Sequence, residues 1–164
     1  MAINSALFSS NKEDWETPQA MFDQLDAKYH FGFDLAASDS NHKCDRYFTE
    51  QDDALSQDWA TIKGPLFLNP PYGRNLRQWI EKACKTASET NLTIVLLIPA
   101  RTDTSYWHDF IFGKASIEFL RGRLKFEQNG VPGNSAPFPS AIVIYNKPVD
   151  VTDDEQLALR TDRL

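Results

Sequence analysis

The stretch Leu66-Phe67-Leu68-Asn69-Pro70-Pro71-Tyr72 places three large apolar residues directly before a polar turn that contains two prolines. A short apolar run of this kind is typical of a buried strand, and it stops abruptly at Asn69. Prolines restrict the backbone, so the turn has few conformations. In open α/β sheets, ligands bind outside the carboxyl ends of the strands. The stretch therefore predicts a buried strand that ends at a binding crevice.

Outward from this stretch, the hydrophobic pattern predicts alternating helices and strands. Thr17-Pro18 followed by spaced apolar residues predicts a helix over about 18–29, with Thr17 as its cap. Further helices are expected over 76–87 and 105–112, and further strands over 31–37, 93–98, 117–120, 124–126 and 141–145. The strand at 93–98 should be central and parallel. This order favours an α/β fold with a doubly wound, Rossmann-like sheet, mostly parallel with an antiparallel edge strand.

Length and composition indicate one domain. A chain of 164 residues with 41% hydrophobic content can fill a single compact core. We expect that domain over residues 15–147, after a loose lead-in at 1–14 and before an acidic tail at 148–164. The sequence has no signal peptide and no run of eighteen apolar residues, and its two cysteines lack a metal or disulfide pattern. A cytoplasmic protein without a membrane anchor is expected.

The formal net charge of −6 is unevenly distributed. Residues 1–60 carry four basic and twelve acidic side chains, whereas residues 61–147 carry eleven basic and six acidic ones. Residues 148–164 carry two basic and five acidic side chains. An acidic protein is at first a poor candidate for nucleic-acid binding, because Lys and Arg supply most non-specific affinity for phosphates. The basic middle of the chain nevertheless permits a phosphate-facing surface.

The turn at 69–72 has residues suited to chemistry on an amine. An exocyclic amine conjugated into a purine is a poor nucleophile, and acceptors on its two N–H bonds free its lone pair. The Asn69 side-chain oxygen and the Pro70 carbonyl oxygen can be those acceptors, and Pro71 helps to hold them in place. Tyr72 offers a flat face on which an extruded base can stack. The competing interpretation is a plain proline turn after a strand.

This signature resembles that of the amino-methyltransferases with an Asn-Pro-Pro-aromatic motif, and more closely that of the phage-type DNA N6-adenine methyltransferases related in name to Dam. The likeness runs from Trp15-Glu16-Thr17-Pro18 to the strand ending at Tyr145. It implies S-adenosylmethionine as methyl donor, S-adenosylhomocysteine as product, and double-stranded DNA as substrate. The target adenine would be flipped out and methylated at N6 by direct in-line transfer. We expect a monomer or weak homodimer, in a bacterial host cell or encoded by a phage.

The resemblance also implies cofactor contacts. In such enzymes a Thr-Pro element before the first strand helps to hold the methionine part of the cofactor; here the alternative is a helix cap. Residues 33–38 resemble a glycine-less version of the family's cofactor loop, and residues 53–55 resemble a segment that contacts the cofactor adenine. Carboxylates can accept from the amine and ribose hydroxyls, although those at 52 and 53 could equally form a solvated loop. The candidate cofactor residues are Glu16, Thr17, Pro18, Asp34, Ala36, Ala37, Asp52, Asp53, Ala54 and Asn69.

Basic and aromatic residues later in the chain are candidates for contacts with DNA. Arg101 follows the strand at 93–98, where a guanidinium could take a phosphate, and Arg121-Gly122-Arg123 is interpreted as a hairpin tip. A surface ion pair and an ordinary charged turn are the alternatives. The Gly- and Pro-rich loop 127–139 is a candidate lid or recognition loop. The candidate substrate residues are Tyr72, Arg74, Arg101, Arg121, Arg123, Phe126 and Phe138.

Other features leave alternatives open. Only about 35 residues separate Asp34 from Asn69, so one or two of the usual helices there must be short or absent. The three histidines have no spacing typical of a metal site, and no metal is expected. The same fold could act on N4 of cytosine, on guanine of RNA or on a glutamine side-chain amide. Alternatively, the glycine-less loop could mark a catalytically inactive DNA-binding module.

Overall fold

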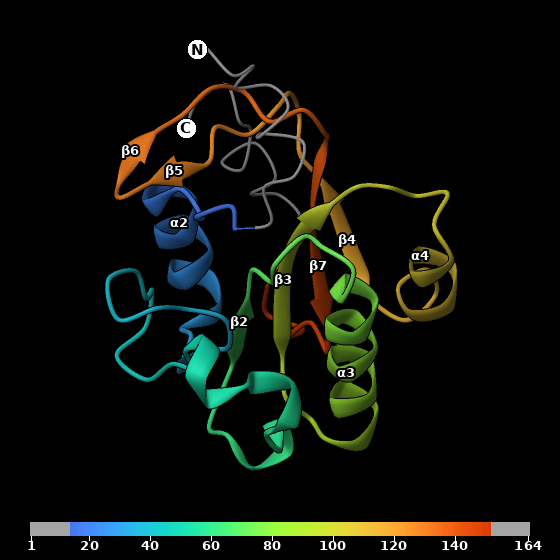
Figure 1. Cartoon of the computed structure of the whole chain (residues 1–164). Helices are drawn as coiled ribbons and strands as arrows, with labels where there is room; N and C mark the ends of the chain where they lie inside the picture. Colours follow the sequence, from blue (N-terminus) through green and yellow to red (C-terminus); the bar gives the residue numbers. More distant parts are fainter. Residues whose placement is uncertain (1–13, 152–164) are drawn as a thin grey trace.

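The computed structural model describes residues 14–151 (Figure 1). The α-helices are α2 (Gln19–Tyr29), α3 (Leu76–Glu89) and α4 (Ser105–Phe110), and the single-turn 3-10 helices are η1 (Glu50–Asp52), η2 (Ala54–Ser56) and η3 (Trp59–Thr61). The strands are β1 (Phe33–Asp34), β2 (Leu66–Leu68), β3 (Ile94–Pro99), β4 (Ser116–Phe119), β5 (Glu127–Gln128), β6 (Val131–Pro132) and β7 (Ser140–Tyr145). Apart from residues 14 and 148–151, the expected lead-in and tail lie outside the described residues.

Five strands form one mixed sheet in the order β1-β2-β3-β7-β4. Strands β1, β2 and β3 are parallel, with Phe33 opposite Leu66 and Leu66 opposite Ile94. Strand β7 is antiparallel to both of its neighbours, β3 and β4. The α/β class, the mostly parallel sheet and the central place of β3 are therefore confirmed, although β3 has a parallel partner on one side only.

The edge strand β4 is paired antiparallel, as expected, but the strand that runs against the other four is β7, which lies inside the sheet rather than at its edge. The burial of the two strands explains this arrangement. All six residues of β7 are buried, whereas only one of the four residues of β4 is buried. A fully apolar strand gains most when it has neighbours on both sides and cover on both faces.

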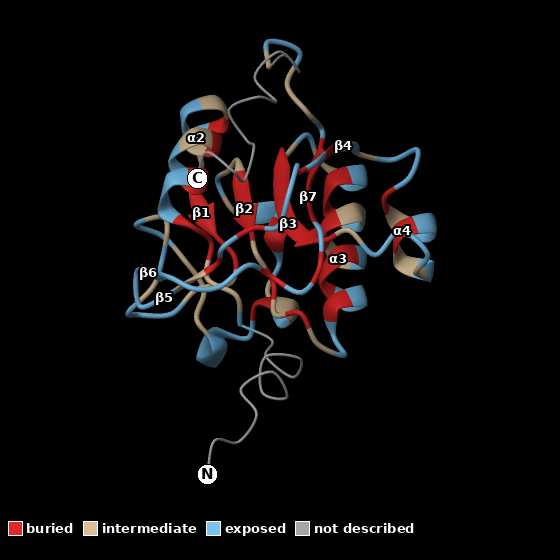
Figure 2. Cartoon of the chain, turned by 90° about the horizontal axis from the view of Figure 1, so that it is seen from above, coloured by how far each residue is buried: buried red, intermediate tan, exposed pale blue. Residues whose placement is uncertain are grey.

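Helices α2 and α3 lie on opposite sides of the sheet (Figure 2). Phe22 of α2 packs edge-on against Phe67 of β2, with ring centroids 5.1 Å apart. Helix α3 buries the stripe of Leu76, Trp79, Ile80 and Ala83, as its amphipathic sequence predicts. All six residues of β3 are buried between these layers. The core therefore holds the carboxyl ends of β2 and β3 in place.

The segment between β4 and β7 differs most from expectation. Residues 124–126 form no strand; the Leu124 carbonyl instead accepts from the Ala136 N–H and the Phe126 carbonyl from the Gly133 N–H, both at 2.9 Å. Residues 120–140 thus form a long segment that folds back on itself, with strand pairing only at β5 and β6; we call it the hairpin arm. Strands β5 and β6 are its tip, where Asn129 and Gly130 have φ values of 53° and 79°, as tight hairpin turns require. The expected hairpin tip at 121–123 is therefore wrong.

The chain between β1 and β2 is compressed, as the short sequence distance predicts. Among the described residues of this connection there is no α-helix, only η1, η2 and η3. Strand β1 is shorter than the expected 31–37, because the chain turns directly after it, where the Ala36 N–H donates to Asp34 Oδ1; residues 46–48 lie beside β1. The Asp34 N–H donates to the Arg46 carbonyl and the Phe48 N–H to the Asp34 carbonyl, both at 3.0 Å. In residues 14–151, no helix is long and apolar enough to cross a membrane.

Candidate active site

Asn69 lies at the carboxyl end of β2 with its amide held on one side only. Its Nδ2 donates to the carbonyl oxygen of Trp15 and, at 2.9 Å, to Oγ1 of Thr17. Its Oδ1 is buried and has no hydrogen-bond partner among the described residues. A buried oxygen without a partner is unfavourable in an isolated protein. Such an atom at a strand end can accept a hydrogen bond from a ligand.

The segment 15–17, which we call the strap, joins Asn69 to the tip of the hairpin arm. The Glu16 carbonyl accepts from the Glu127 N–H at 2.9 Å, and the Glu16 carboxylate accepts from the Asn129 N–H at 3.1 and 3.2 Å. Thr17 is buried and does not cap α2, whose N-cap residue is Pro18 and lacks a side-chain cap. The expected capping role of Thr17 is therefore wrong, because its hydroxyl is used by Asn69.

Tyr72 lies inside an aromatic cluster. Its ring packs edge-on against Phe138 at 5.7 Å and Phe126 at 6.1 Å, and both of these rings contact Trp15. Only 8% of Tyr72 is exposed, and its hydroxyl donates to the Leu97 carbonyl. Burial raises the pKa of Tyr72 well above its ordinary value. The structure thus brings Tyr72, Phe126 and Phe138 together. Of the two prolines that precede Tyr72 in the chain, Pro70 is buried and Pro71 is half-buried.

The carboxylate of Asp34 is buried within the loop that follows β1. Its Oδ2 accepts from the Lys43 N–H at 2.9 Å, and its Oδ1 accepts from the Ala36 N–H at 3.3 Å. Burial raises the pKa of Asp34 to about 6, against the opposing effect of these amides and of nearby positive charge. The Ala37 N–H donates to the Phe48 carbonyl. These hydrogen bonds hold the loop in shape, and its expected contact with a cofactor stays a prediction.

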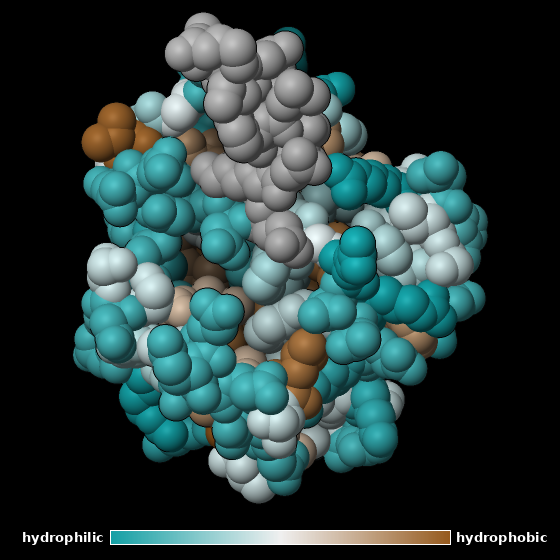
Figure 3. All heavy atoms as spheres, in the orientation of Figure 1, coloured by the Kyte–Doolittle hydropathy of each residue, from teal (hydrophilic) through white to brown (hydrophobic). Residues whose placement is uncertain are grey.

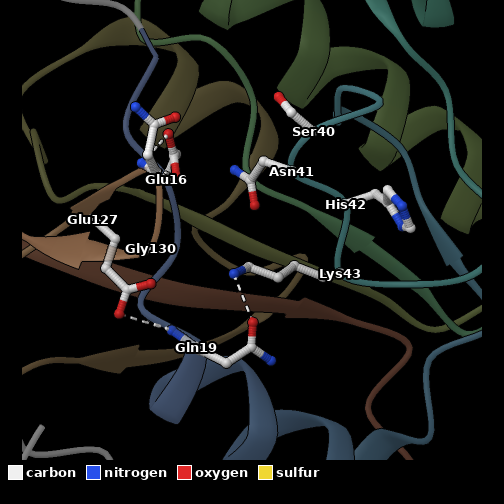
Figure 4. A pocket seen from close by; sticks show the side chains of 9 residues that line it. Glu16, Gln19, Ser40, Asn41, His42, Lys43, Glu127 and Gly130 are labelled. Atoms are coloured by element: carbon white, nitrogen blue, oxygen red, sulfur yellow. Dashed lines mark hydrogen bonds between the residues drawn. The ribbon is translucent and has the colours of Figure 1, made fainter.

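A cavity of about 590 Å³ lies between this loop, the start of α2 and the tip of the hairpin arm (Figure 4). Lys43 reaches across it, and its Nζ donates to Gln19 Oε1 at 2.9 Å. The Gln19 N–H in turn donates to the Glu127 carboxylate at 3.3 Å. The cavity therefore combines an ammonium group with two carboxylates. Its lining residues are Glu16, Gln19, Ser40, Asn41, His42, Lys43, Glu127, Asn129 and Gly130.

Glu16 is the only expected cofactor residue in this lining, and Glu127, Asn129 and Gly130 belong to the loop 127–139 that was a candidate lid. His42, to which no role was assigned, lies in the wall, and its ring stacks on Tyr47 at 4.1 Å. Among the lining residues, Asn129-Gly130 could be identified as a turn from the sequence, because this dipeptide is typical of hairpin turns. No comparable pattern marks Asn41 or Lys43, because ordinary polar loops contain the same residue types.

Asp52, Asp53 and Ala54 lie outside the cavity and stabilise their own turns. The Asp52 carboxylate accepts from the Thr49 N–H at 2.8 Å, and the Ala54 carbonyl accepts from the Trp59 indole N–H at 2.8 Å. Asp53 is exposed, with a left-handed φ of 52°. Their expected cofactor role stays a prediction. No group of three His, Cys, Asp or Glu suited to a metal ion is found within residues 14–151.

The four arginines that were expected to contact DNA lie on the surface, unlike the buried Tyr72, Phe126 and Phe138. Arg74, Arg101, Arg121 and Arg123 are all exposed. The Arg101 guanidinium lies 5.5 Å from the centroid of the Phe138 ring, and Arg123 Nη1 donates to the Ala136 carbonyl at 3.4 Å. Arg101 and Arg123 therefore both contact the hairpin arm. The face seen in Figure 3 is largely hydrophilic, and the hairpin tip carries Val131, which is 64% exposed.

Comparisons with known proteins point to one family. The family model described as "DNA N-6-adenine-methyltransferase (Dam)" matches residues 4–153. The DNA N-6-adenine-methyltransferase of Escherichia phage T1 is 27% identical over 117 residues, which cover 71% of this chain and 48% of the phage protein. That of Haemophilus phage HP1 is 27% identical over 133 residues, or 79% of this chain and 75% of the phage protein. YfdM of Escherichia coli is 38% identical over 65 residues, or 37% of this chain and 71% of YfdM. The chain thus spans about half of the phage T1 protein.

Proposed function

The chain belongs to the DNA N-6-adenine-methyltransferase (Dam) family, and we propose that it transfers a methyl group from S-adenosylmethionine to the N6 amine of adenine in DNA. The observation that carries the proposal is the buried Oδ1 of Asn69 at the end of β2, which has no hydrogen-bond partner within residues 14–151. The sheet order, with helices on both sides, supports a doubly wound, Rossmann-like interpretation in which this position faces the ligand crevice.

Asn69 acts by accepting a hydrogen bond from the amine. In the transfer, the N6 lone pair would take the methyl group, the electron pair of the broken carbon–sulfur bond would stay on S-adenosylhomocysteine, and the proton lost by the amine would pass to solvent. The Oδ1 of Asn69 and the Pro70 carbonyl oxygen each accept one N–H of the amine. These two hydrogen bonds draw the nitrogen towards sp³ geometry, so its lone pair is no longer delocalised into the purine ring. Because these acceptors are already in place, little reorganisation is needed during transfer. The bound cofactor supplies an electrophilic methyl group on a positively charged sulfur.

The cavity beside the strap has groups that fit the amino-acid end of such a cofactor. The α-ammonium of a methionine moiety pairs with carboxylates, and its α-carboxylate pairs with an ammonium or backbone N–H groups. Glu16, Glu127 and Lys43 provide both kinds of partner in one cavity of about 590 Å³. The Lys43 ammonium donates to Gln19, and release of this one hydrogen bond would let it turn to a ligand carboxylate.

The flipped base is proposed to stack against Tyr72. In the structure that ring is covered by Phe126 and Phe138, both on the hairpin arm. Entry of a base next to Tyr72 therefore requires these two rings to move away from it. One of them then covers the second face of the base. The arginines that contact the arm, Arg101 and Arg123, would bind the flanking phosphates.

Replacement of Asn69 by alanine tests the proposal. We expect turnover to fall by about a hundredfold or more, with little change in the affinity for S-adenosylhomocysteine measured by calorimetry, because the lost contact is made mainly in the transition state. Asn75→Ala is a matched control, since Asn75 is exposed at the start of α3 and makes no side-chain cap. Near-normal turnover in Asn69→Ala would contradict the assignment.

The substrate is tested with the same labelled cofactor offered with DNA, RNA and protein. Nucleoside analysis of the methylated DNA should show N6-methyladenine. A product of N4-methylcytosine, labelled RNA or labelled protein would move the chain to one of the alternative activities. Failure to bind S-adenosylhomocysteine at all would instead favour a DNA-binding module.

A further inference from the structure

We propose that Thr17 is a positioning residue which, together with the main-chain carbonyl of Trp15, sets the orientation of the Asn69 amide and makes asparagine the required residue at that position. This inference rests on the proposed function, because it concerns how the acceptor oxygen of Asn69 is presented. Thr17 and Asn69 are 52 residues apart in the chain, yet their side chains are joined directly by a hydrogen bond of 2.9 Å.

The two partners of Asn69 determine which end of its amide faces the strap. A main-chain carbonyl oxygen can only accept, so the amide atom that faces Trp15 must be the nitrogen. The second N–H of the same nitrogen is taken by Thr17 Oγ1. Both donors of the amide are therefore used inside the protein, and Oδ1 is left on the opposite side without a partner among the described residues.

The flipped amide is excluded by the same two contacts. Rotation by half a turn would place Oδ1 against the Trp15 carbonyl, with two acceptors facing each other, and would leave both N–H groups of Nδ2 without these partners. Oδ1 would then no longer be available to the substrate amine. Thr17 is 3% exposed and makes no cap contact with α2, so its hydroxyl is held in the position that Asn69 needs.

The same geometry separates asparagine from aspartate. An aspartate at position 69 would present only acceptors to the Trp15 carbonyl when ionised, and that contact would become repulsive. If Asn69 served only as an acceptor towards the substrate, the stronger acceptor of Asn69→Asp should support turnover. If the contacts with the strap position the group, Asn69→Asp should instead lose most activity.

Variants of Thr17 separate positioning from packing. Thr17→Val keeps the shape of the side chain and removes the hydroxyl, and we expect kcat to fall by about tenfold or more while KM for the cofactor stays close to the parent. Thr17→Ser keeps the hydroxyl and should retain turnover within about threefold of the parent. Thr93→Val is the matched control, because Thr93 is also buried and bonds the Asn146 carbonyl rather than Asn69.

A second measurement does not depend on methylation. The side-chain NH₂ signals of Asn69, assigned by their loss in Asn69→Ala, should exchange slowly with solvent in the parent and in Thr17→Ser. They should exchange at least about tenfold faster in Thr17→Val, because one of the two hydrogen bonds is gone. Thr93→Val should leave these signals as they are in the parent.

The outcomes distinguish the inference from the proposed function. Parental kcat and parental NH₂ protection in Thr17→Val would overturn the positioning role, as would full activity of Asn69→Asp. A loss of S-adenosylhomocysteine affinity in Thr17→Val, with kcat retained at saturating cofactor, would overturn it in favour of a direct cofactor contact. If the parent methylates no DNA, the proposed function fails, and the exchange of the NH₂ signals still decides whether Thr17 holds the amide.

Discussion

The hydroxyl of Tyr72 donates a hydrogen bond of 2.8 Å to the main-chain carbonyl of Leu97, which ties the turn after β2 to the neighbouring strand β3. Because burial raises the pKa of Tyr72 well above its ordinary value, the phenol remains a donor at any pH at which the protein is studied. Tyr72 therefore supports the turn that carries Asn69, whether or not its ring also receives a base.

Substitutions at Tyr72 should separate these roles. Tyr72→Phe removes one buried hydrogen bond and should lower the free energy of unfolding by about 1 kcal/mol while most turnover is kept. Tyr72→Ala also leaves a cavity and should cost about 3 to 5 kcal/mol. Urea denaturation measures both changes in stability.

The role of Tyr72 in base binding is tested separately. With 2-aminopurine at the target position, the fluorescence rise that accompanies flipping should be retained in Tyr72→Phe and reduced in Tyr72→Ala. An unchanged fluorescence response in a folded Tyr72→Ala protein would remove Tyr72 from base binding.

The pKa of Asp34 predicts a dependence of stability on pH. Its pKa is raised from 3.8 to about 6 in the folded protein, so the folded state holds this proton more tightly than the unfolded state. The resulting stabilisation is fully present below about pH 4 and is lost as the pH rises through 6. It amounts to about 1 to 3 kcal/mol. The unfolding free energy of the parent minus that of Asp34→Asn should therefore fall as the pH rises from about 4 to about 6. A value that does not change with pH would contradict the raised pKa of Asp34.

The strap should control the docking of the hairpin tip. Glu16→Ala removes the carboxylate that accepts from the Asn129 N–H, and we expect this amide to exchange about fivefold faster, equivalent to about 1 kcal/mol. The Glu127 N–H, which bonds the Glu16 main chain, should be less affected. Glu50→Ala, a change at an exposed residue of η1, serves as the control. Equal exchange of the Asn129 amide in parent and variant would show that the carboxylate does not hold the tip.

Arg123 of the hairpin arm and Arg101, which lies beside the arm at Phe138, should contribute to DNA affinity through phosphates. Removal of Arg101 or Arg123 should weaken binding to all DNA sequences and reduce the slope of log affinity against log salt by about one unit for each contact. Arg77→Gln is a suitable control, because its guanidinium is used by Asp109 at 3.1 Å and Ser105 at 2.9 Å. Unchanged slopes in both variants would make these arginines ordinary surface charges.

The local elements of the fold could be predicted from apolar runs and helical periodicity. Strands β2, β3 and β7 and helices α2 and α3 lie within a few residues of expectation, because each buries a continuous apolar stretch or stripe. The place of β7 between β3 and β4 could not be predicted, since nothing within the strand identifies its neighbours. The hairpin at β5 and β6 had a turn signal at Asn129-Gly130, but its flanking residues are exposed and show no apolar alternation.

The site was predicted in part. The sequence places Asn69 at a strand end and identifies the family to which the chain belongs. It could not show that Thr17 and Trp15 hold the Asn69 amide, because these contacts span more than fifty residues and involve a main-chain atom. Nor could it show that Phe126 and Phe138 cover Tyr72, because their burial depends on how residues 120–140 fold back.

The interior position of β7 has a consequence for synthesis of the chain on the ribosome. Strand β7 lies between β3 and β4 and pairs with both. These two strands are therefore not joined into one sheet until residues 140–145 have emerged. During translation the growing chain therefore carries two unpaired strand edges, at β3 and at β4, and such edges promote association between chains. A truncation between residues 120 and 140 leaves β4 without a partner strand, separate from the β1-β2-β3 part of the sheet. Completion of the sheet therefore waits for the last strand, although the Asn69 turn of the candidate active site is synthesised much earlier.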